Sequence, residues 1–352
     1  MFEPSDHPRL FGCAPGVDFP RAVVDGLETR MHAAPPEAWA RVTLLVNTTR
    51  MARRLRDLFD AGPARLLPRI RMITQLDALA PLTPLPPAAS PLRRKLELAQ
   101  FIRTLLETEP DLAPDAGPFD LADSLAALMD EMQGEGVSAE DIARLDVSDQ
   151  SGHWARAQQF IGIVQRYIDE SQSAPDPEGR QRTTVLRLAE HWAHSPPTDP
   201  VLVVGSTGSR GTTLRLMQAV ARLPQGAVIL PGFDDQMPAM VWDSLGQVQA
   251  TKGNAQEDHP QYRFLRLCQA LSIDPSDIAA WTHTPPPSPP RNALVSLALR
   301  PAPVTDAWRE EGPELADLGA ATDAITLVEA DTPRAEALAI AMRLRHAAEA
   351  GQ

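Results

Sequence analysis

The residues Pro8-Arg-Leu-Phe-Gly-Cys-Ala-Pro-Gly-Val-Asp-Phe-Pro-Arg-Ala-Val-Val24 decide the fold of this chain. They run from a short apolar segment, through a turn that contains Gly12 and Gly16, into the start of an apolar helix. Pro20 stands near the beginning of that helix, where the first turn tolerates proline. The segment therefore predicts a strand that ends in a glycine-bearing turn and continues as a helix over Phe19–Met31.

The turn has the layout of a phosphate-binding P-loop but lacks its chemistry. A P-loop reads G-x-x-x-x-G-K-[ST], with the lysine on the β- and γ-phosphates and the Ser or Thr on Mg²⁺. Here Gly12 and Gly16 are only four positions apart, and Val17 and Asp18 replace the Lys and the Ser/Thr. Asp18 would repel a phosphate. We therefore expect Gly12 and Gly16 to mark a degenerate P-loop that does not support ATP hydrolysis.

The composition limits the classes of function. With 352 residues, of which 43% are apolar, the chain can form roughly two to three ordered domains. Its net charge of −13 argues against nucleic-acid binding by the chain alone, although a local basic groove is compatible with that charge. Cys13 and Cys268 form neither a disulfide framework nor a zinc pattern. The absence of an apolar leader and of a long apolar run predicts a cytoplasmic protein without membrane association.

Apolar runs indicate strands on either side of a helical stretch. Val42–Val46, Val201–Val204 and Ala227–Leu230 are uninterrupted apolar runs, which are typical of strands buried on both faces. Between residues 92 and 193 the apolar positions instead recur every three to four residues, which indicates helices. The sequence therefore predicts an α/β fold in which a parallel sheet domain is interrupted by an all-α insertion.

The remaining elements follow from the same patterns. Asn47, Thr48 and Thr49 are N-cap candidates for the helix that follows the strand Val42–Val46, and Asp176–Arg180 is predicted to be a loop. Further strands are predicted at Arg9–Gly12, Leu66–Ile73 and Ile325–Glu329, and further helices over Arg50–Phe59, Trp154–Ile168, Thr183–Ala193, Thr213–Arg222 and Pro333–Ala350.

The turn Gly205-Ser-Thr-Gly-Ser-Arg-Gly-Thr-Thr213 is the sharpest local feature, because it follows a buried strand and opens a helix. Backbone N–H groups at a helix N-terminus attract anions, and hydroxyl and guanidinium groups add donors. One interpretation is a cradle for a phosphate of nucleotide or DNA; the other is a flexible turn with Thr212 or Thr213 as N-cap. The candidate phosphate or DNA contacts are Ser206, Thr207, Ser209, Arg210 and Thr212.

Catalytic and metal-binding residues are not evident. In an active NTPase a strand such as Val201–Val204 would end in acidic residues that hold Mg²⁺, whereas here Gly205 and Ser206 follow. Asp234, Asp235 and Gln236 follow another strand, either at the ligand-binding edge of the sheet or in a solvated loop. No metal-ligand spacing is found for His191 and His194, and a solvated helix face is expected for Arg50, Arg53, Arg54 and Arg56.

The order of these features resembles the first half of a superfamily 1 helicase, and the degraded ATPase motifs resemble the AddB family, whose members pair with AddA in bacterial double-strand-break resection. The resemblance extends over essentially all 352 residues, but only over about the N-terminal third of such a subunit. The segments that carry it are Pro8–Gly16, Leu121–Gly136, Asp146–Trp154, Gly205–Thr213 and Asp258–Phe264.

The resemblance implies a domain organisation. Residues 1–90 and 194–320 would form the first RecA-like domain, which is helicase-like and ATPase-degenerate. Residues 91–193 would form its helical insertion, and residues 321–352 the start of a second RecA-like domain. The family's iron–sulfur cluster and Mg²⁺ belong to a C-terminal nuclease domain, so no cofactor, metal or catalytic residue is expected in this segment.

The resemblance also implies a role. The parent complex is an ATP-dependent helicase and exonuclease, within which this segment would be a non-catalytic scaffold that docks on AddA. It would guide single-stranded DNA at DNA ends, without a membrane partner. Two alternatives stay open: a nucleotide- or phosphate-ligand-binding α/β enzyme that uses the Ser206–Thr213 loop, and a purely structural interaction module.

Overall fold

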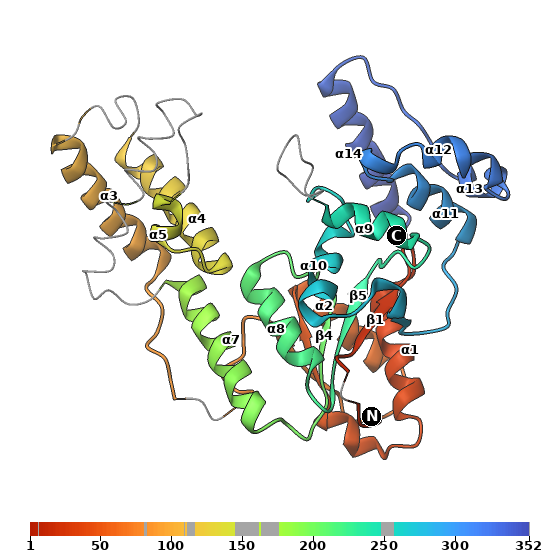
Figure 1. The fold of residues 1–352 in the computed structure, drawn as a ribbon, viewed down its shortest axis with the longest axis horizontal. Helices are drawn as coiled ribbons and strands as arrows, with labels where there is room; N and C mark the ends of the chain where they lie inside the picture. The colour runs from red at the N-terminus through yellow and green to blue at the C-terminus, as the bar shows by residue number, and fades with distance from the viewer. Residues whose placement is uncertain are drawn as a thin grey trace.

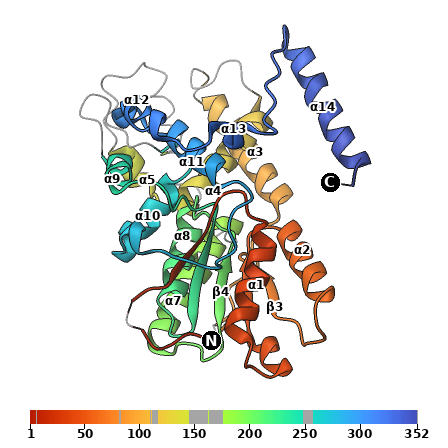
Figure 2. The same ribbon diagram turned by 90° about the vertical axis from the view of Figure 1, so that its right-hand side faces the viewer.

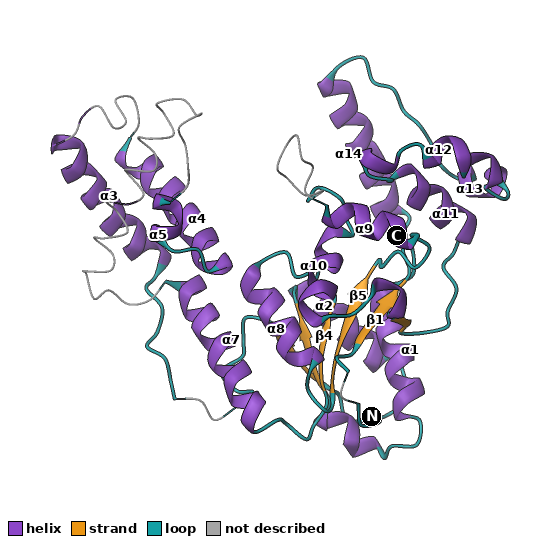
Figure 3. Cartoon of the chain, viewed as in Figure 1, coloured by secondary structure: helices purple, strands orange, loops and turns teal. Residues whose placement is uncertain are grey.

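The computed structural model describes residues 1–5, 7–80, 83–108, 110, 117–144, 162, 176–247 and 257–351. Within these residues the chain forms a parallel sheet with helices on both faces, and a helical body that stands beside it (Figures 1 and 3). This is an α/β fold of the RecA-like type, interrupted by a helical insertion, as the sequence predicts. No helix among the described residues has the length and apolar character needed to cross a membrane.

In the part of the chain that the structure describes, the sheet has six strands in the order β3-β2-β4-β5-β1-β6, and their pairings are all parallel. Leu45 of β2 is in register with Val203 of β4, and Val203 with Val228 of β5. One strand, β5, therefore separates β1 from β4, and the turns after β1 and after β4 lie at the same edge of the sheet. The strands are β1 (Leu10–Cys13), β2 (Thr43–Val46), β3 (Arg69–Met72), β4 (Val201–Val204), β5 (Gly226–Pro231) and β6 (Ala279–Ala280).

Strand side chains alternate between two cores, as a sheet covered on both faces requires. In β4, Val203 packs into the core formed with α7, α8, α9 and α10, whereas Leu202 packs against α1 and α2 on the opposite face. Figure 2 shows the two helical layers on either side of the sheet. The helices are α1 (Phe19–Met31), α2 (Thr49–Asp60), α7 (Pro177–His194), α8 (Gly211–Ala221), α9 (Ala239–Gly246) and α10 (Tyr262–Leu271).

The helical insertion contains α3 (Pro91–Thr108), α4 (Pro118–Glu135) and the short α5 (Ala139–Ala143). It has a small core of its own, in which Ile102 and Leu125 are buried. An ion pair of 2.5 Å between Arg94 and Asp130 joins α3 to α4. The segment Asp146–Trp154 and, apart from Gly162, the predicted helix over Trp154–Ile168 lie outside the described residues.

Two sequence predictions are wrong. Asp176–Arg180 is not a loop: α7 begins at Pro177, and the Asp176 carboxylate caps it by accepting from the backbone N–H of Gly179 at 2.8 Å. Ile325–Glu329 forms no strand, and its residues are exposed in a loop. An apolar run becomes a strand only where neighbouring strands pair with its backbone, and none of the six described strands does so.

The C-terminal part of the chain contains helices that lie beyond the sheet. The predicted helix near the end is present as α14, but its apolar side chains, including Leu338 and Leu344, are exposed. The helices here are α11 (Pro289–Ala298), α12 (Ala307–Glu310), α13 (Leu318–Thr322) and α14 (Pro333–Glu349), and short 3-10 helices span Pro36–Arg41, Pro275–Asp277, Ala302–Val304 and Gly312–Glu314.

Candidate functional site at the carboxyl edge of the sheet

The turn between β1 and α1 is closed by its own side chains. Asp18 is the N-cap of α1, and its carboxylate accepts from the backbone N–H of Arg21 at 3.3 Å. The same carboxylate forms an ion pair of 3.2 Å with Arg54 of α2. A P-loop holds phosphate at this end of its helix, so Asp18 occupies the anion position that a nucleotide would need.

Gly12 and Gly16 have packing roles in this turn. A Cβ atom on Gly12 would lie 2.7 Å from the ring of Phe233, which leaves no room for a side chain. Gly16 has a φ of +84°, a left-handed conformation that favours glycine. Asn292 of α11 donates from Nδ2 to the carbonyl oxygen of Pro15 at 2.9 Å, so α11 is fastened to this turn. The degenerate P-loop is therefore a packed structural element.

A cavity of about 280 Å³ lies beside β1, and Cys13, Asp235 and His283 contribute to its lining. Burial raises the pKa of the Cys13 thiol to about 12, so this thiol stays protonated near neutral pH and is a poor nucleophile. Burial also raises the pKa of Asp235. Asp234 organises its own loop instead, because its carboxylate accepts from the backbone N–H of Gln236 at 3.1 Å.

Two glycines with positive φ and a hydrogen bond from a neighbouring loop fix the shape of the turn between β4 and α8. Gly205 and Gly208 have φ values of +78° and +67°. Asn47, which follows β2, donates from Nδ2 to the carbonyl oxygen of Gly205 at 2.8 Å. Inside the turn, Ser206 Oγ accepts from the backbone N–H of Gly208 at 3.3 Å. The ends of β2 and β4 are thus joined into one polar edge.

A cavity of about 460 Å³ opens at this edge, between the sheet and the first turn of α7. Thr207, Ser209 and Arg210 are exposed on it, whereas Ser206 and Thr212 are buried. The structure therefore brings together the sequence-predicted contacts, although nothing in it tests their binding of phosphate. The facing wall includes Asn47, Thr74, Glu178, Arg180 and Gln181.

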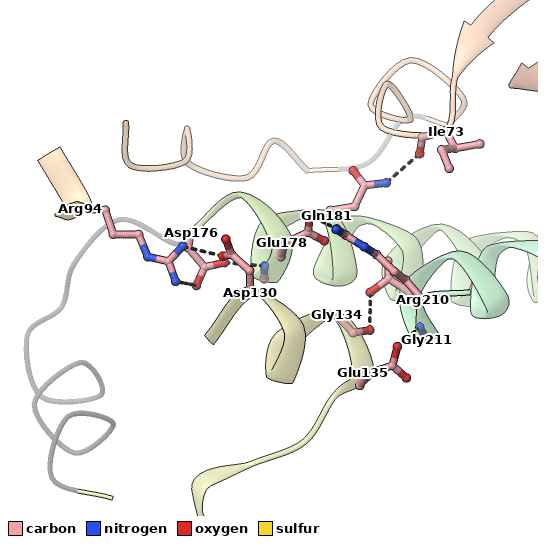
Figure 4. A network of polar contacts seen from close by, with 12 residues as sticks. Ile73, Arg94, Asp130, Gly134, Glu135, Asp176, Glu178, Gln181, Arg210 and Gly211 are labelled. Atoms are coloured by element: carbon pink, nitrogen blue, oxygen red, sulfur yellow. Dashed lines mark hydrogen bonds and ion pairs between the residues drawn. The ribbon is translucent and has the colours of Figure 1, made fainter. Parts of the chain in front are cut away.

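The helical insertion contacts the first turn of α8 directly (Figure 4). Glu135, the last residue of α4, accepts from the backbone N–H of Gly211 at 2.8 Å. Thr212 donates from Oγ1 to the carbonyl oxygen of Gly134 at 3.0 Å. Neither Thr212 nor Thr213 is the N-cap of α8, because the cap position is Arg210 and its side chain makes no capping bond. A carboxylate from another helix takes the place of a local cap.

Arg210 is braced by an acidic residue from another helix. Its Nη1 atom lies 2.7 Å from Oε1 of Glu178 in the first turn of α7. The Arg210 side chain remains 65% exposed, so most of its guanidinium group is open to the solvent and to a ligand. Sequence reasoning missed both Glu135 and Glu178, because their partners lie 76 and 32 positions away along the chain.

The remaining candidates are placed elsewhere. Within its own helix, the His194 ring lies 3.0 Å from the carbonyl oxygen of Glu190 through Nδ1. Arg50, Arg53 and Arg56 are exposed on α2, the solvated face that the sequence predicts. In the part of the chain that the structure describes, no group of three or more His, Cys, Asp or Glu side chains is arranged to hold a metal ion.

Neither a scan against protein-family models nor a search of curated proteins finds a match for this chain. Its fold is RecA-like with a helical insertion, and its two strand-to-helix turns differ. The helix after β1 is capped by Asp18, and the cavity beside that turn is lined by Cys13, Asp235 and His283. The cavity at the turn after β4 is instead lined by exposed hydroxyl and guanidinium groups.

Proposed function

We propose that this chain is the helicase-like, non-catalytic N-terminal part of an AddB-type subunit. It acts with AddA in the resection of DNA ends, and so in double-strand-break repair and homologous recombination, as a scaffold and a guide for the DNA strand. The observation that carries the proposal is the contrast between a nucleotide position filled by Asp18 and an open cavity that exposes Thr207, Ser209 and Arg210.

The chemistry of the cavity supports binding to a phosphate backbone. Hydroxyl groups, arginines and helix N-termini are the groups that fix a protein on nucleic-acid phosphates. Arg210 and Arg180 both line the cavity, and Glu178 and Asp77 neutralise part of their charge. Moderate rather than tight contact is expected from such partly paired arginines, which suits a strand that must move through the complex.

The residues that bind and hydrolyse ATP in a P-loop enzyme are missing from both positions, the turn after β1 and the end of β4. Val17 and Asp18 replace the P-loop Lys and Ser/Thr, and Gly205 and Ser206 follow β4 where acidic residues would hold Mg²⁺. The driving hydrolysis would therefore come from AddA. This division of labour rests on the family resemblance and on these substitutions.

A phosphate-ligand-binding enzyme is the second candidate, because a cavity of about 460 Å³ has the size of a small-molecule site. Its weakness is the acidic residue in the described lining, Glu178, which pairs with Arg210. A free nucleotide carries more negative charge per phosphate than a diester strand and is less compatible with this carboxylate.

A ligand-binding comparison tests the proposal. The full chain, alone and mixed with AddA, is titrated with a fluorescent ATP analogue and with a labelled duplex that carries single-stranded tails. We expect the chain to associate with AddA, to bind tailed DNA in that complex, and neither to bind nor to hydrolyse ATP by itself. ATP turnover by the chain that disappears on changing Gly12 or Gly16 would contradict the proposal. Saturable ATP binding that is lost in Ser209→Ala would favour the phosphate-ligand enzyme.

A further inference from the structure

A second groove lies on the outer side of α8 and has a volume of about 560 Å³. Three arginines from three helices line it: Arg182 of α7, Arg215 of α8 and Arg266 of α10. Figure 1 shows α8 between α7 and α10, and α8 contacts both. We propose that this α8 groove is a binding site for the phosphates of a DNA backbone, separate from the cavity at the turn after β4.

The arginines of the α8 groove give it a local positive charge, although the chain as a whole has a net charge of −13. Arg215 and Arg266 are exposed, and neither forms a hydrogen bond or ion pair with the described residues. Arg94 and Arg300, by contrast, pair with carboxylates at 2.5 and 3.0 Å. Arg182 is half-buried and packs at the end of α4, donating weakly to the carbonyl oxygen of Gly134 at 3.4 Å. Arg182 is therefore a fixed cation beside two that make no such contact with the residues that the structure describes.

The groove keeps an excess of positive charge. Of the described residues that line it, Glu135 alone is acidic, and its Oε1 atom accepts from the backbone N–H of Gly211. The partial positive charge at the N-terminus of α8 therefore compensates this carboxylate. Three guanidinium groups face the remainder of the groove, and each can form two parallel hydrogen bonds to one phosphate.

The lining favours a nucleic-acid backbone over a protein partner. Protein interfaces depend on buried aromatic or large apolar anchors, whereas the apolar side chains that line this groove are Leu214 and Ala270. Protein–DNA interfaces are polar and strongly positive, and the amides of Gln218 and Gln269 add donors here. Since no aromatic side chain among the described residues lines the groove, bases have no stacking platform. The contact is therefore to phosphates and tolerates duplex DNA of any sequence.

The α8 groove and the cavity described above flank the same turn. Arg210, Thr212 and Thr213 line one side, while Gly211, Leu214 and Arg215 line the other. A backbone that crosses the first turn of α8 would meet both. The inference rests on the proposed function for its ligand class, but it depends on different residues and so can fail alone.

The test is the salt dependence of binding to a short, blunt, labelled duplex, measured for the full chain alone and with AddA. Each phosphate contact contributes about 0.9 to the slope of log affinity against log salt. The double variant Arg215→Ala/Arg266→Ala should therefore lower that slope by about 2 and weaken binding equally for unrelated sequences. Arg215→Lys/Arg266→Lys keeps both charges and should retain most of the slope.

Arg334→Ala/Arg343→Ala is the matched control, because it removes the same charge from exposed positions on α14. It should leave the slope unchanged. A wild-type slope in Arg215→Ala/Arg266→Ala, with folding verified by its thermal melt, would overturn the inference. If Arg210→Ala lowered the slope in the same experiment, the proposed function would survive that result. If the wild-type chain bound no DNA, either alone or with AddA, the inference and the proposed function would both fail. DNA binding without any association with AddA would contradict the proposed function alone.

Discussion

The turns after β1 and after β4 begin alike and end differently. Each follows a parallel strand and opens a helix, and each contains glycine with positive φ: Gly16 in the first turn, Gly205 and Gly208 in the second. In the first turn the anion position is filled by Asp18, which caps a backbone N–H three residues away. In the second it is filled by Glu135, which comes from the helical insertion 76 positions away.

The two carboxylates, Asp18 and Glu135, differ in which part of the chain holds each of them at its helix end. Asp18 belongs to the helix that it caps and pairs with Arg54, so its removal would require the local structure to change. Glu135 comes instead from the helical insertion, which has a small core of its own, and it reaches Gly211 through a contact between two packed helices. The same helix-end chemistry is thus satisfied by a local residue at β1 and by a tertiary contact at β4.

The largest loss of stability is expected from a substitution at Gly12, because the turn after β1 is a packed structural element. Gly12→Ala forces a Cβ atom against the Phe233 ring and should lower the free energy of unfolding by about 1–3 kcal/mol. Urea unfolding measures it. Gly312→Ala is the control, since a Cβ atom there meets nothing within 4 Å. Equal stability of the two variants would contradict the packing role of Gly12.

Glu135→Ala tests the contact between the insertion and α8. Removal of a carboxylate that caps a helix costs about 1 kcal/mol, and the backbone amide of Gly211 should exchange its hydrogen faster. Glu135→Gln keeps an acceptor and should cost less. Glu131→Ala, an exposed position one turn earlier on α4, is the control for both measurements. Slow exchange at Gly211 in Glu135→Ala would show that this carboxylate does not protect it.

Asp18→Ala should lower the free energy of unfolding slightly less than Glu135→Ala does, by about 1 kcal/mol or below, because the N-cap that is lost is exposed. Asp18→Asn keeps the cap while removing the charge, so it should retain most of the stability. Neither variant should gain ATP binding, since the lysine of a P-loop is still missing. Thermal melts and titration with a fluorescent ATP analogue measure both outcomes. Nucleotide affinity gained in Asp18→Asn would mean that this turn is a masked nucleotide site.

The smallest effect is expected from His259, which joins α10 to the end of α11. Its Nε2–H donates to the carbonyl oxygen of Leu299 at 2.9 Å while Nδ1 accepts from the backbone N–H of Gln261 at 3.2 Å, which defines a neutral ring. Burial lowers its pKa below 6.5. The stability that this ring contributes is therefore present above pH 6.5 and is lost as the pH falls through the lowered pKa. Urea unfolding across that range should show the loss, and His259→Gln should flatten it.

The sequence predicts the central strands of the sheet well because strands buried on both faces are recognisable as apolar runs. Thr48, one of three proposed caps, is the N-cap of α2, with its side chain accepting from Met51. The short β6 has no such run: Ala279 and Ala280 are exposed, and they join the sheet through pairing with β1. Ile325–Glu329 shows the opposite failure, since an apolar run alone supplies no strand partner.

The candidate site was predictable only in part. A glycine-rich turn after a buried strand is a local signal, so Ser206–Thr212 could be found from the sequence. Glu135 and Glu178 carry no local signal, because they act through contacts between helices that are distant along the chain. The arginines of the α8 groove are likewise spread over three helices, and only the packing of α7, α8 and α10 brings them together.

The most direct test of the central claim, that the turn after β4 contacts DNA while the turn after β1 does not bind nucleotide, is the salt dependence of tailed-duplex binding by Arg210→Ala in complex with AddA. We predict a slope lower than wild type by about 0.7–0.9, similar for all sequences, with Arg334→Ala unchanged. Because the Arg210–Glu178 pair is exposed, stability should change by less than about 1 kcal/mol. An unchanged slope together with a clearly lower melting temperature would contradict the account, since Arg210 would then only brace Glu178.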